Sequence, residues 1–89
     1  MAWTIEFDAR AIKDLQRLER SEQLRIQRYL YDRVATAALP RALGKALVGP
    51  KFGQLWRYRI GDYRVVCQID DGRVLVLVLE VGHRRKIYR

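Results

Sequence analysis

The sequence has little of what builds cross-links, metal sites or membrane anchors. Its 89 residues include one cysteine, Cys67, and one histidine, His83. A single cysteine cannot form an internal disulfide, and one cysteine with one histidine does not make a four-ligand zinc site. We therefore predict no structural metal, and we expect Cys67 to be a small core residue.

The sequence also lacks any run of 18 apolar residues, and its first residues lack the charged-then-apolar pattern of a signal peptide. These absences predict a cytoplasmic protein. A chain of 89 residues that is 49% hydrophobic can bury one core but not two. We expect a single domain that spans residues 1–89.

Acidic residues are too few to balance the basic ones, because 18 lysines and arginines face 10 aspartates and glutamates. The excess lies in the second half, where residues 45–89 hold ten basic and four acidic side chains. Arginine outnumbers lysine 14 to 4, and a planar guanidinium suits bidentate phosphate contacts. The charge predicts a polyanionic partner, with phosphate the favoured counter-charge.

The first half of the chain reads as one strand and two helices. Apolar and polar residues alternate over residues 3–7, which is typical of a strand with one buried face. Asp8 is placed to cap a helix that runs through Arg20, and Ser21 to cap a second helix that ends before Pro40. The short break between the two predicts an antiparallel helix pair.

Residues 39–53 hold both prolines and three glycines, which predicts an irregular connection with one helical turn around residues 41–46. After it the pattern changes to strands. Gly61-Asp62 suits a type II′ hairpin turn and Asp71-Gly72 a type I′ turn. The strand from Arg73 is nearly all apolar, so we expect it to be central.

These elements predict an α+β fold of order β-αα-βββ. An antiparallel helix pair packs on one face of a four-stranded, mainly antiparallel sheet. Trp3 and Trp56 are predicted to pack in the core or at its rim. The leucines Leu75, Leu77 and Leu79 are predicted to share a face with Arg64, which would then need a partial cover such as the connection or a partner segment.

Three arginines share one face of the first predicted hairpin. A turn at Gly61-Asp62 puts Arg59 opposite Arg64, and Arg57 has the same parity as Arg59. Like charges in this position destabilise a sheet by a few tenths to ~1 kcal/mol. An anion would turn the repulsion into a phosphate-binding site. The alternative is solvated positions, each beside an acidic residue such as Glu6 or Glu80.

The end of the chain is a basic cluster with an interleaved aromatic. His83 is followed by Arg84, Arg85 and Lys86, and Tyr88 is the aromatic. Such a cluster can hold phosphate while it stacks a splayed base, which predicts a single-stranded nucleic acid ligand. His83 is the one side chain whose ordinary pKa suits proton transfer near neutrality, so it is a candidate acid or base. A phosphate contact is the alternative role.

Four segments, in this order, resemble the RelE/ParE superfamily of bacterial toxins over nearly the whole chain. They are residues 7–11 with the following helix, 42–49, 55–65 and 81–85. The resemblance implies a RelE-like toxin domain with the β-αα-βββ fold. It also implies neutralisation by a cognate antitoxin, and a higher-order complex of the two that binds operator DNA.

The RelE-like branch cleaves mRNA in the ribosomal A site. By resemblance, Arg57 and Arg59 take the basic positions of the first hairpin, Arg64 that of the next strand, Arg84 the one after the glycine, and Tyr88 the terminal aromatic. The implied reaction is attack of a ribose 2′-hydroxyl on the adjacent phosphate, without metal or cofactor.

Arg57 and Arg59 stand where some RelE proteins have lysines, so the general base is not identified, since a guanidinium does not accept a proton. Two other functions stay open. The ParE-like branch binds and inhibits DNA gyrase without cutting RNA, but it commonly lacks part of this basic set. A non-catalytic nucleic-acid-binding module would show salt-dependent affinity and no product.

Overall fold

The computed structural model describes residues 2–47 and 55–83. The chain begins with strand β1 (Thr4–Phe7) and helix α1 (Ala9–Gln16). Asp8 caps α1 as predicted, because its carboxylate accepts a hydrogen bond from the Arg10 backbone N–H at 3.2 Å. The prediction that this helix reaches Arg20 is wrong. It ends four residues earlier, and the freed Leu18 carbonyl instead accepts a bond from the Gln23 side chain.

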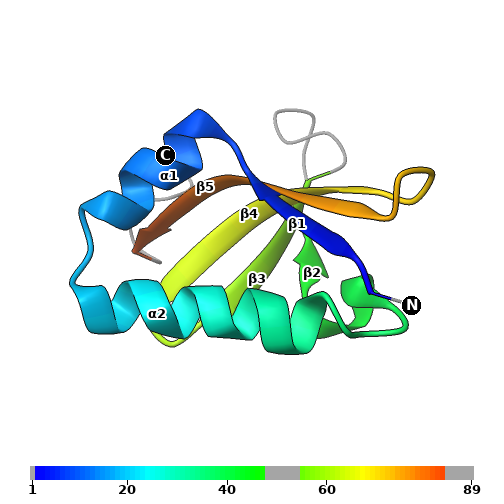
Figure 1. Ribbon diagram of the computed structural model, residues 1–89, viewed down its shortest axis with the longest axis horizontal. Coiled ribbons are helices and arrows are strands. Elements are labelled where there is room, and N and C mark those ends of the chain that lie inside the picture. Colours follow the sequence, from blue (N-terminus) through cyan, green and yellow to red (C-terminus); the bar gives the residue numbers. More distant parts are fainter. Residues whose placement is uncertain (1, 48–54, 84–89) are drawn as a thin grey trace.

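The second helical segment consists of α2 (Arg20–Arg28) and a π-helical continuation, η1 (Tyr29–Val34). The predicted cap at Ser21 is wrong, since the capping position is Glu19, whose side chain makes no capping bond. The predicted apolar stripe is confirmed, because Ile26, Leu30 and Val34 are fully buried. In Figure 1, α1 and α2 run in opposite directions, as expected of the pair.

The sheet has five strands rather than the predicted four. Its order is β1-β5-β4-β3-β2, with β1 parallel to β5 and all other pairs antiparallel. The later strands are β2 (Lys45–Ala46), β3 (Trp56–Ile60), β4 (Tyr63–Asp70) and β5 (Leu75–His83). β2 comes from the connection predicted to be irregular. It is two residues long and exists only through its pairing with β3, so no local pattern announces it.

The first hairpin has the predicted register, with Ile60 opposite Tyr63 and Arg59 opposite Arg64. Gly61 has a φ of 60° while Asp62 does not have a positive φ, which fits a type II′ turn.

The second hairpin differs from the prediction. Asp70 pairs with Leu75, so four residues form the turn, and Val74 takes the left-handed conformation at φ 52°. The Asp70 carboxylate stabilises this wider turn by accepting a bond from the Arg73 backbone N–H at 3.2 Å. Asp70 pairs two residues further along β5 than predicted, and a shift of two residues keeps each side chain on the same face. Leu75 and Leu77 therefore stay on the face of Arg64. A bulge between Val66 and Cys67 removes Leu79 from that row.

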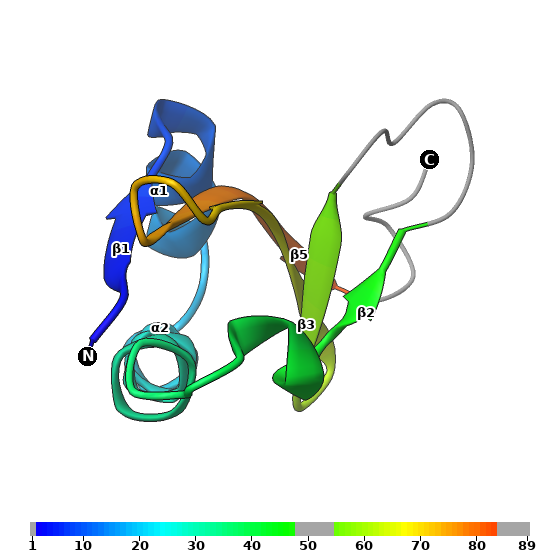
Figure 2. The ribbon, with the colours of Figure 1, turned by 90° about the vertical axis from the view of Figure 1, so that its right-hand side faces the viewer.

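The helices lie together on one side of the sheet (Figure 2). The core between them and the sheet includes Tyr58, Val65, Cys67 and Val78, all fully buried. Trp3 and Trp56 are partly buried and pack against this core, as predicted. Among the described residues, no helix is both long and apolar enough to span a membrane.

Candidate nucleic-acid interface

The face of the sheet opposite the helices carries Arg57, Arg59 and Arg64, which we call the arginine face. Tyr58 and Ile60 point into the core, so the alternating side chains of Arg57 and Arg59 point the other way. Arg59 lies directly opposite Arg64, as predicted. Arg59 is exposed, whereas Arg57 and Arg64 are half-buried. The sheet therefore brings together the three arginines that the sequence selected.

The described residues provide no acidic partner for Arg57 and Arg59, two of the three arginines of this face. Within the described residues, no carboxylate lies within 4.0 Å of Arg57 or Arg59. Glu80, the acidic neighbour considered from the sequence, pairs instead with Arg10 of α1. Arg57 and Arg59 thus lack the counter-charges that the solvated-face alternative invoked. Such a surface can bind the phosphates of a nucleic acid.

Two hydrogen bonds on the helix side of the sheet, one of them buried, tie strand β3 to the preceding turn. The Tyr58 hydroxyl donates to the Pro40 carbonyl at 2.8 Å, and Trp56 Nε1 donates to the Arg41 carbonyl at 3.1 Å. Both acceptors belong to a 3-10 turn, η2 (Pro40–Leu43). Burial raises the pKa of Tyr58, so its hydroxyl stays protonated and remains a donor. These two bonds hold the strand that carries Arg57 and Arg59 against residues 40 and 41.

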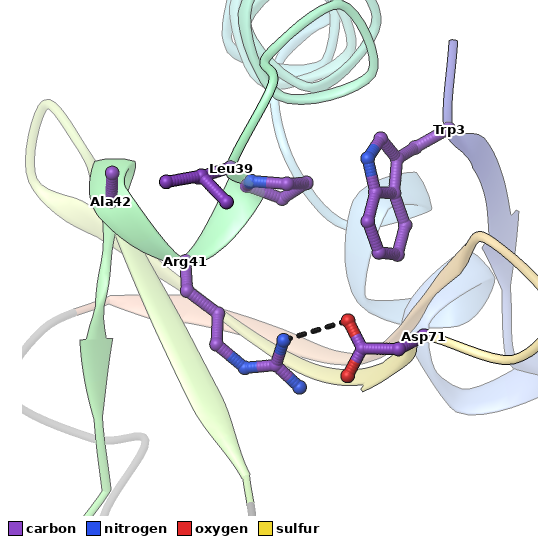
Figure 3. A pocket seen from close by; sticks show the side chains of 6 residues that line it. Trp3, Leu39, Arg41, Ala42 and Asp71 are labelled. Atoms are coloured by element: carbon purple, nitrogen blue, oxygen red, sulfur yellow. Dashed lines mark hydrogen bonds and ion pairs between the residues drawn. The ribbon is translucent and has the colours of Figure 1, made fainter. Parts of the chain in front are cut away.

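An ion pair ties η2 to the turn between β4 and β5. The Arg41 guanidinium donates to the Asp71 carboxylate at 2.9 Å, beneath a hollow of about 330 Å³ that Trp3 and Leu39 also line (Figure 3). The bond from Arg41 lowers the pKa of Asp71, and Arg41 also stacks on Trp56 with 5.8 Å between its guanidinium carbon and the ring centre. Of the predicted site residues that the structure describes, none lines this hollow. We assign it a structural role.

The structure does not bring His83 together with the three arginines of the arginine face. His83 is opposite Tyr63, and their rings meet edge to face with centroids 5.9 Å apart. Tyr63 packs against the core, so His83 lies on the helix side of the sheet. There it lines a hollow of about 440 Å³ whose wall includes Glu19 and Glu22. The sequence does not give this placement, because the pairing of His83 depends on the β-bulge.

The remaining predicted site residues, Arg84, Arg85, Lys86 and Tyr88, lie outside the described residues. Sequence reasoning missed two basic groups. Lys45 lies directly opposite Arg57 on β2. A hollow of about 400 Å³ also joins Arg59 to the arginines of the second helical segment, among them Arg28 and Arg33. The helical periodicity of these arginines could have revealed the second group, whereas nothing local reveals the first.

Comparison with known proteins identifies the family. Residues 5–88 match the family described as the ParE toxin of the type II toxin–antitoxin system parDE. The chain is 30% identical over 86 residues to the mRNA interferase toxin RelE of Escherichia coli, covering 97% of this chain and 87% of that protein. It is 34% identical over 85 residues to toxin RelE of Mycobacterium tuberculosis, covering 96% and 84%.

The fold agrees with this family. A chain of the toxin–antitoxin complex RelBE2 from Mycobacterium tuberculosis superposes with a TM-score of 0.84 at 27% identity, covering 94% of this chain and 93% of that one. Sequence, topology and the basic face of the sheet lead to one assignment. The chain belongs to the RelE/ParE superfamily of type II toxin–antitoxin toxins and is RelE-like.

Proposed function

We propose that this toxin is a ribosome-dependent endoribonuclease that cleaves mRNA in the A site and so inhibits translation. The observation that carries the proposal is the opposition of Arg59 and Arg64, with Arg57 beside them on the same face of the sheet. A solely structural sheet gains nothing from this repulsion. The naming of an E. coli relative as an mRNA interferase supports the same reading.

The proposed chemistry is transesterification within the RNA. The ribose 2′-oxygen attacks the adjacent phosphorus and loses its proton, while the bond from phosphorus to the 5′-oxygen breaks and that oxygen gains a proton. The products are a cyclic 2′,3′-phosphate and a 5′-hydroxyl, and no metal or cofactor takes part. Arg57, Arg59 and Arg64 stabilise the extra negative charge of the pentavalent phosphorane.

The residues after β5 complete the proposal. Arg84 neutralises the leaving oxygen, Arg85 and Lys86 contact RNA phosphates, and Tyr88 stacks on a base. The proposal leaves His83 out of proton transfer at the arginine face, because its side chain lies on the helix side of the sheet. Replacement of His83 by alanine should accordingly leave the single-turnover cleavage rate unchanged.

The proposed partners follow from charge and family. A cognate antitoxin, of the kind found in the toxin–antitoxin complex RelBE2 from Mycobacterium tuberculosis, would cover basic and apolar surface and silence the toxin. Complexes of the two proteins would bind their operator DNA. On the ribosome, Arg28 and Arg33 would contact ribosomal RNA phosphates while the arginine face holds the mRNA.

Primer-extension mapping of a defined mRNA on translating ribosomes tests the proposal, with naked RNA beside it. We expect coding-region cuts that require ribosomes, that disappear in Arg64→Ala and that persist in the control Arg73→Ala. Arg73 is an exposed arginine in the turn between β4 and β5, away from the arginine face.

The alternative is a gyrase inhibitor, which the match to the ParE toxin family favours. If expression arrests growth without any cuts, a DNA supercoiling assay with purified gyrase decides. Inhibition there, with intact mRNA, would replace the ribonuclease proposal.

A further inference from the structure

Lys45 extends the arginine face by one strand. It lies on β2 directly opposite Arg57, and Arg59 follows two residues further along β3 on the same side. Lys45, Arg57 and Arg59 share a surface hollow of about 280 Å³, and the other described residues that line it are residues 42–44. We call this hollow the Lys45 subsite.

The backbone of this subsite is fixed by close packing. A Cβ atom on Gly44 would collide with the Arg57 carbonyl oxygen and come within 2.8 Å of Trp56 Cδ1. Glycine therefore lets the chain approach β3 closely enough to pair there. The bond from Trp56 to η2 holds the preceding turn. As a result Lys45 is held beside Arg57.

The charges of the subsite have no counter-charge in the described residues. No carboxylate there lies within 4.0 Å of Lys45, Arg57 or Arg59. Lys45 and Arg59 are exposed, so their charges are available to a ligand. Like charges in direct cross-strand opposition repel, and a bound anion between Lys45 and Arg57 would remove that repulsion.

The row of cations is longer than one phosphate group. Lys45 lies on β2 and Arg64 on β4, two spacings of about 4.8 Å apart, and Arg64 is also offset by two residues along its strand, so their backbones are separated by about 12 Å. The hollow also has an apolar wall, Ala42 and Leu43, against which a ribose or base can pack. A second phosphodiester with its nucleoside suits this combination better than a free anion does.

We propose that the Lys45 subsite binds the phosphodiester next to the scissile one in single-stranded RNA, with Lys45 as a substrate-contacting residue. This inference rests on the proposed ribonuclease function and names a second contact between enzyme and substrate. Loss of the Lys45 charge should lower kcat/KM on programmed ribosomes about tenfold, as expected for the loss of one charged contact.

The experiment compares Lys45→Ala, Lys45→Arg and the control Lys13→Ala, whose lysine is exposed on α1. Each protein is given mRNA with ordinary linkages, or with one neutral methylphosphonate on either side of the scissile phosphate. At one of the two positions, the neutral linkage should lower kcat/KM of the wild type and of Lys13→Ala. The decrease should equal the one that Lys45→Ala shows on ordinary RNA. That position should have no added effect in Lys45→Ala, and Lys45→Arg should retain most activity.

Two outcomes would overturn the subsite while leaving the ribonuclease function intact. One is a Lys45→Ala enzyme that cleaves as well as Lys13→Ala does. The other is that each neutral linkage lowers kcat/KM of Lys45→Ala by the same factor as it lowers that of the wild type. Effects that combine in this way are independent, so Lys45 would contact neither phosphate. Absence of cleavage by the wild type on any RNA would instead overturn the ribonuclease function, and the subsite with it.

Discussion

Arg59 on β3 and Arg64 on β4 lie directly opposite each other on the arginine face. The repulsion between these two charges lowers the free energy of unfolding. Replacing one of them should therefore lower the cleavage activity without lowering the stability of the fold. Arg59→Ala should lower the cleavage rate about a hundredfold, the usual effect of losing one donor to a transition-state oxyanion. It should leave the free energy of unfolding unchanged or raise it by up to ~1 kcal/mol.

Single-turnover cleavage and urea unfolding of the same preparations check this prediction, with Arg73→Ala as the matched control. A variant that loses both activity and stability would mean that Arg59 supports the fold rather than the chemistry.

The arginine face could be predicted from the sequence because it depends on only two local features, a turn and the alternation of side chains along a strand. Gly61-Asp62 sets the turn, and side-chain alternation then places Arg57, Arg59 and Arg64 on one face. Lys45 could not be found in this way, because its position depends on pairing with a distant strand. The placement of His83 depends on a bulge that no local pattern specifies.

At the scale of the element, η2 acts as a clamp on β3 through the buried bond from Tyr58 to the Pro40 carbonyl. Tyr58→Phe leaves that acceptor without its donor and should cost about 1–3 kcal/mol of unfolding free energy. The control is Tyr31→Phe, because Tyr31 is 48% exposed. Equal urea midpoints for the two variants would contradict the clamp.

The link between η2 and the β4-β5 turn should depend on pH. The hydrogen bond from Arg41 lowers the pKa of Asp71 from its ordinary 3.8. Since the folded state holds the charged form more strongly, the stabilisation is present above pH 3.8 and is lost as the pH falls through the lowered pKa. Wild type should therefore be slightly more stable than Asp71→Asn at neutral pH, with the difference vanishing in acid.

Urea midpoints at neutral and acidic pH measure that difference, and Asp32→Asn serves as the control for loss of an exposed carboxylate. A gap between wild type and Asp71→Asn that stays constant with pH would refute the assigned ion pair.

Sequence patterns gave the order of the main elements but not their ends. The apolar stripe of Ile26, Leu30 and Val34 identified the second helical segment, yet its change to π-helix in η1 left no trace in the pattern. Asp71-Gly72 suggested a two-residue turn, but the bond from Arg73 N–H to Asp70 favours a wider one. Side-chain contacts of this kind are invisible to periodicity.

At the scale of the whole molecule, basic charge continues from the arginine face around the β3 edge to α2 and η1. Arg28 shares a hollow with Arg59, whereas Arg20 of the same helix lies outside it. If this region contacts ribosomal RNA, Arg28→Ala should raise the KM for ribosomes roughly fivefold, the effect of about 1 kcal/mol from one exposed charge. The cleavage rate at saturation should stay the same.

Arg20→Ala is the control, and titration of programmed ribosomes gives both quantities. If Arg28→Ala instead lowers the saturated rate and leaves the KM unchanged, the helix arginines act on the chemistry and not on docking.

The central claim is that the arginine face serves a reaction in which the RNA attacks itself. The most direct measurement uses ribosomes programmed with an mRNA that carries one 2′-deoxynucleotide at the scissile position of the A-site codon, compared with the all-ribose mRNA. The account predicts cleavage of the ribose substrate to a 2′,3′-cyclic phosphate and no cleavage of the deoxy substrate. Equal cleavage of both, or cleavage of neither, would contradict it.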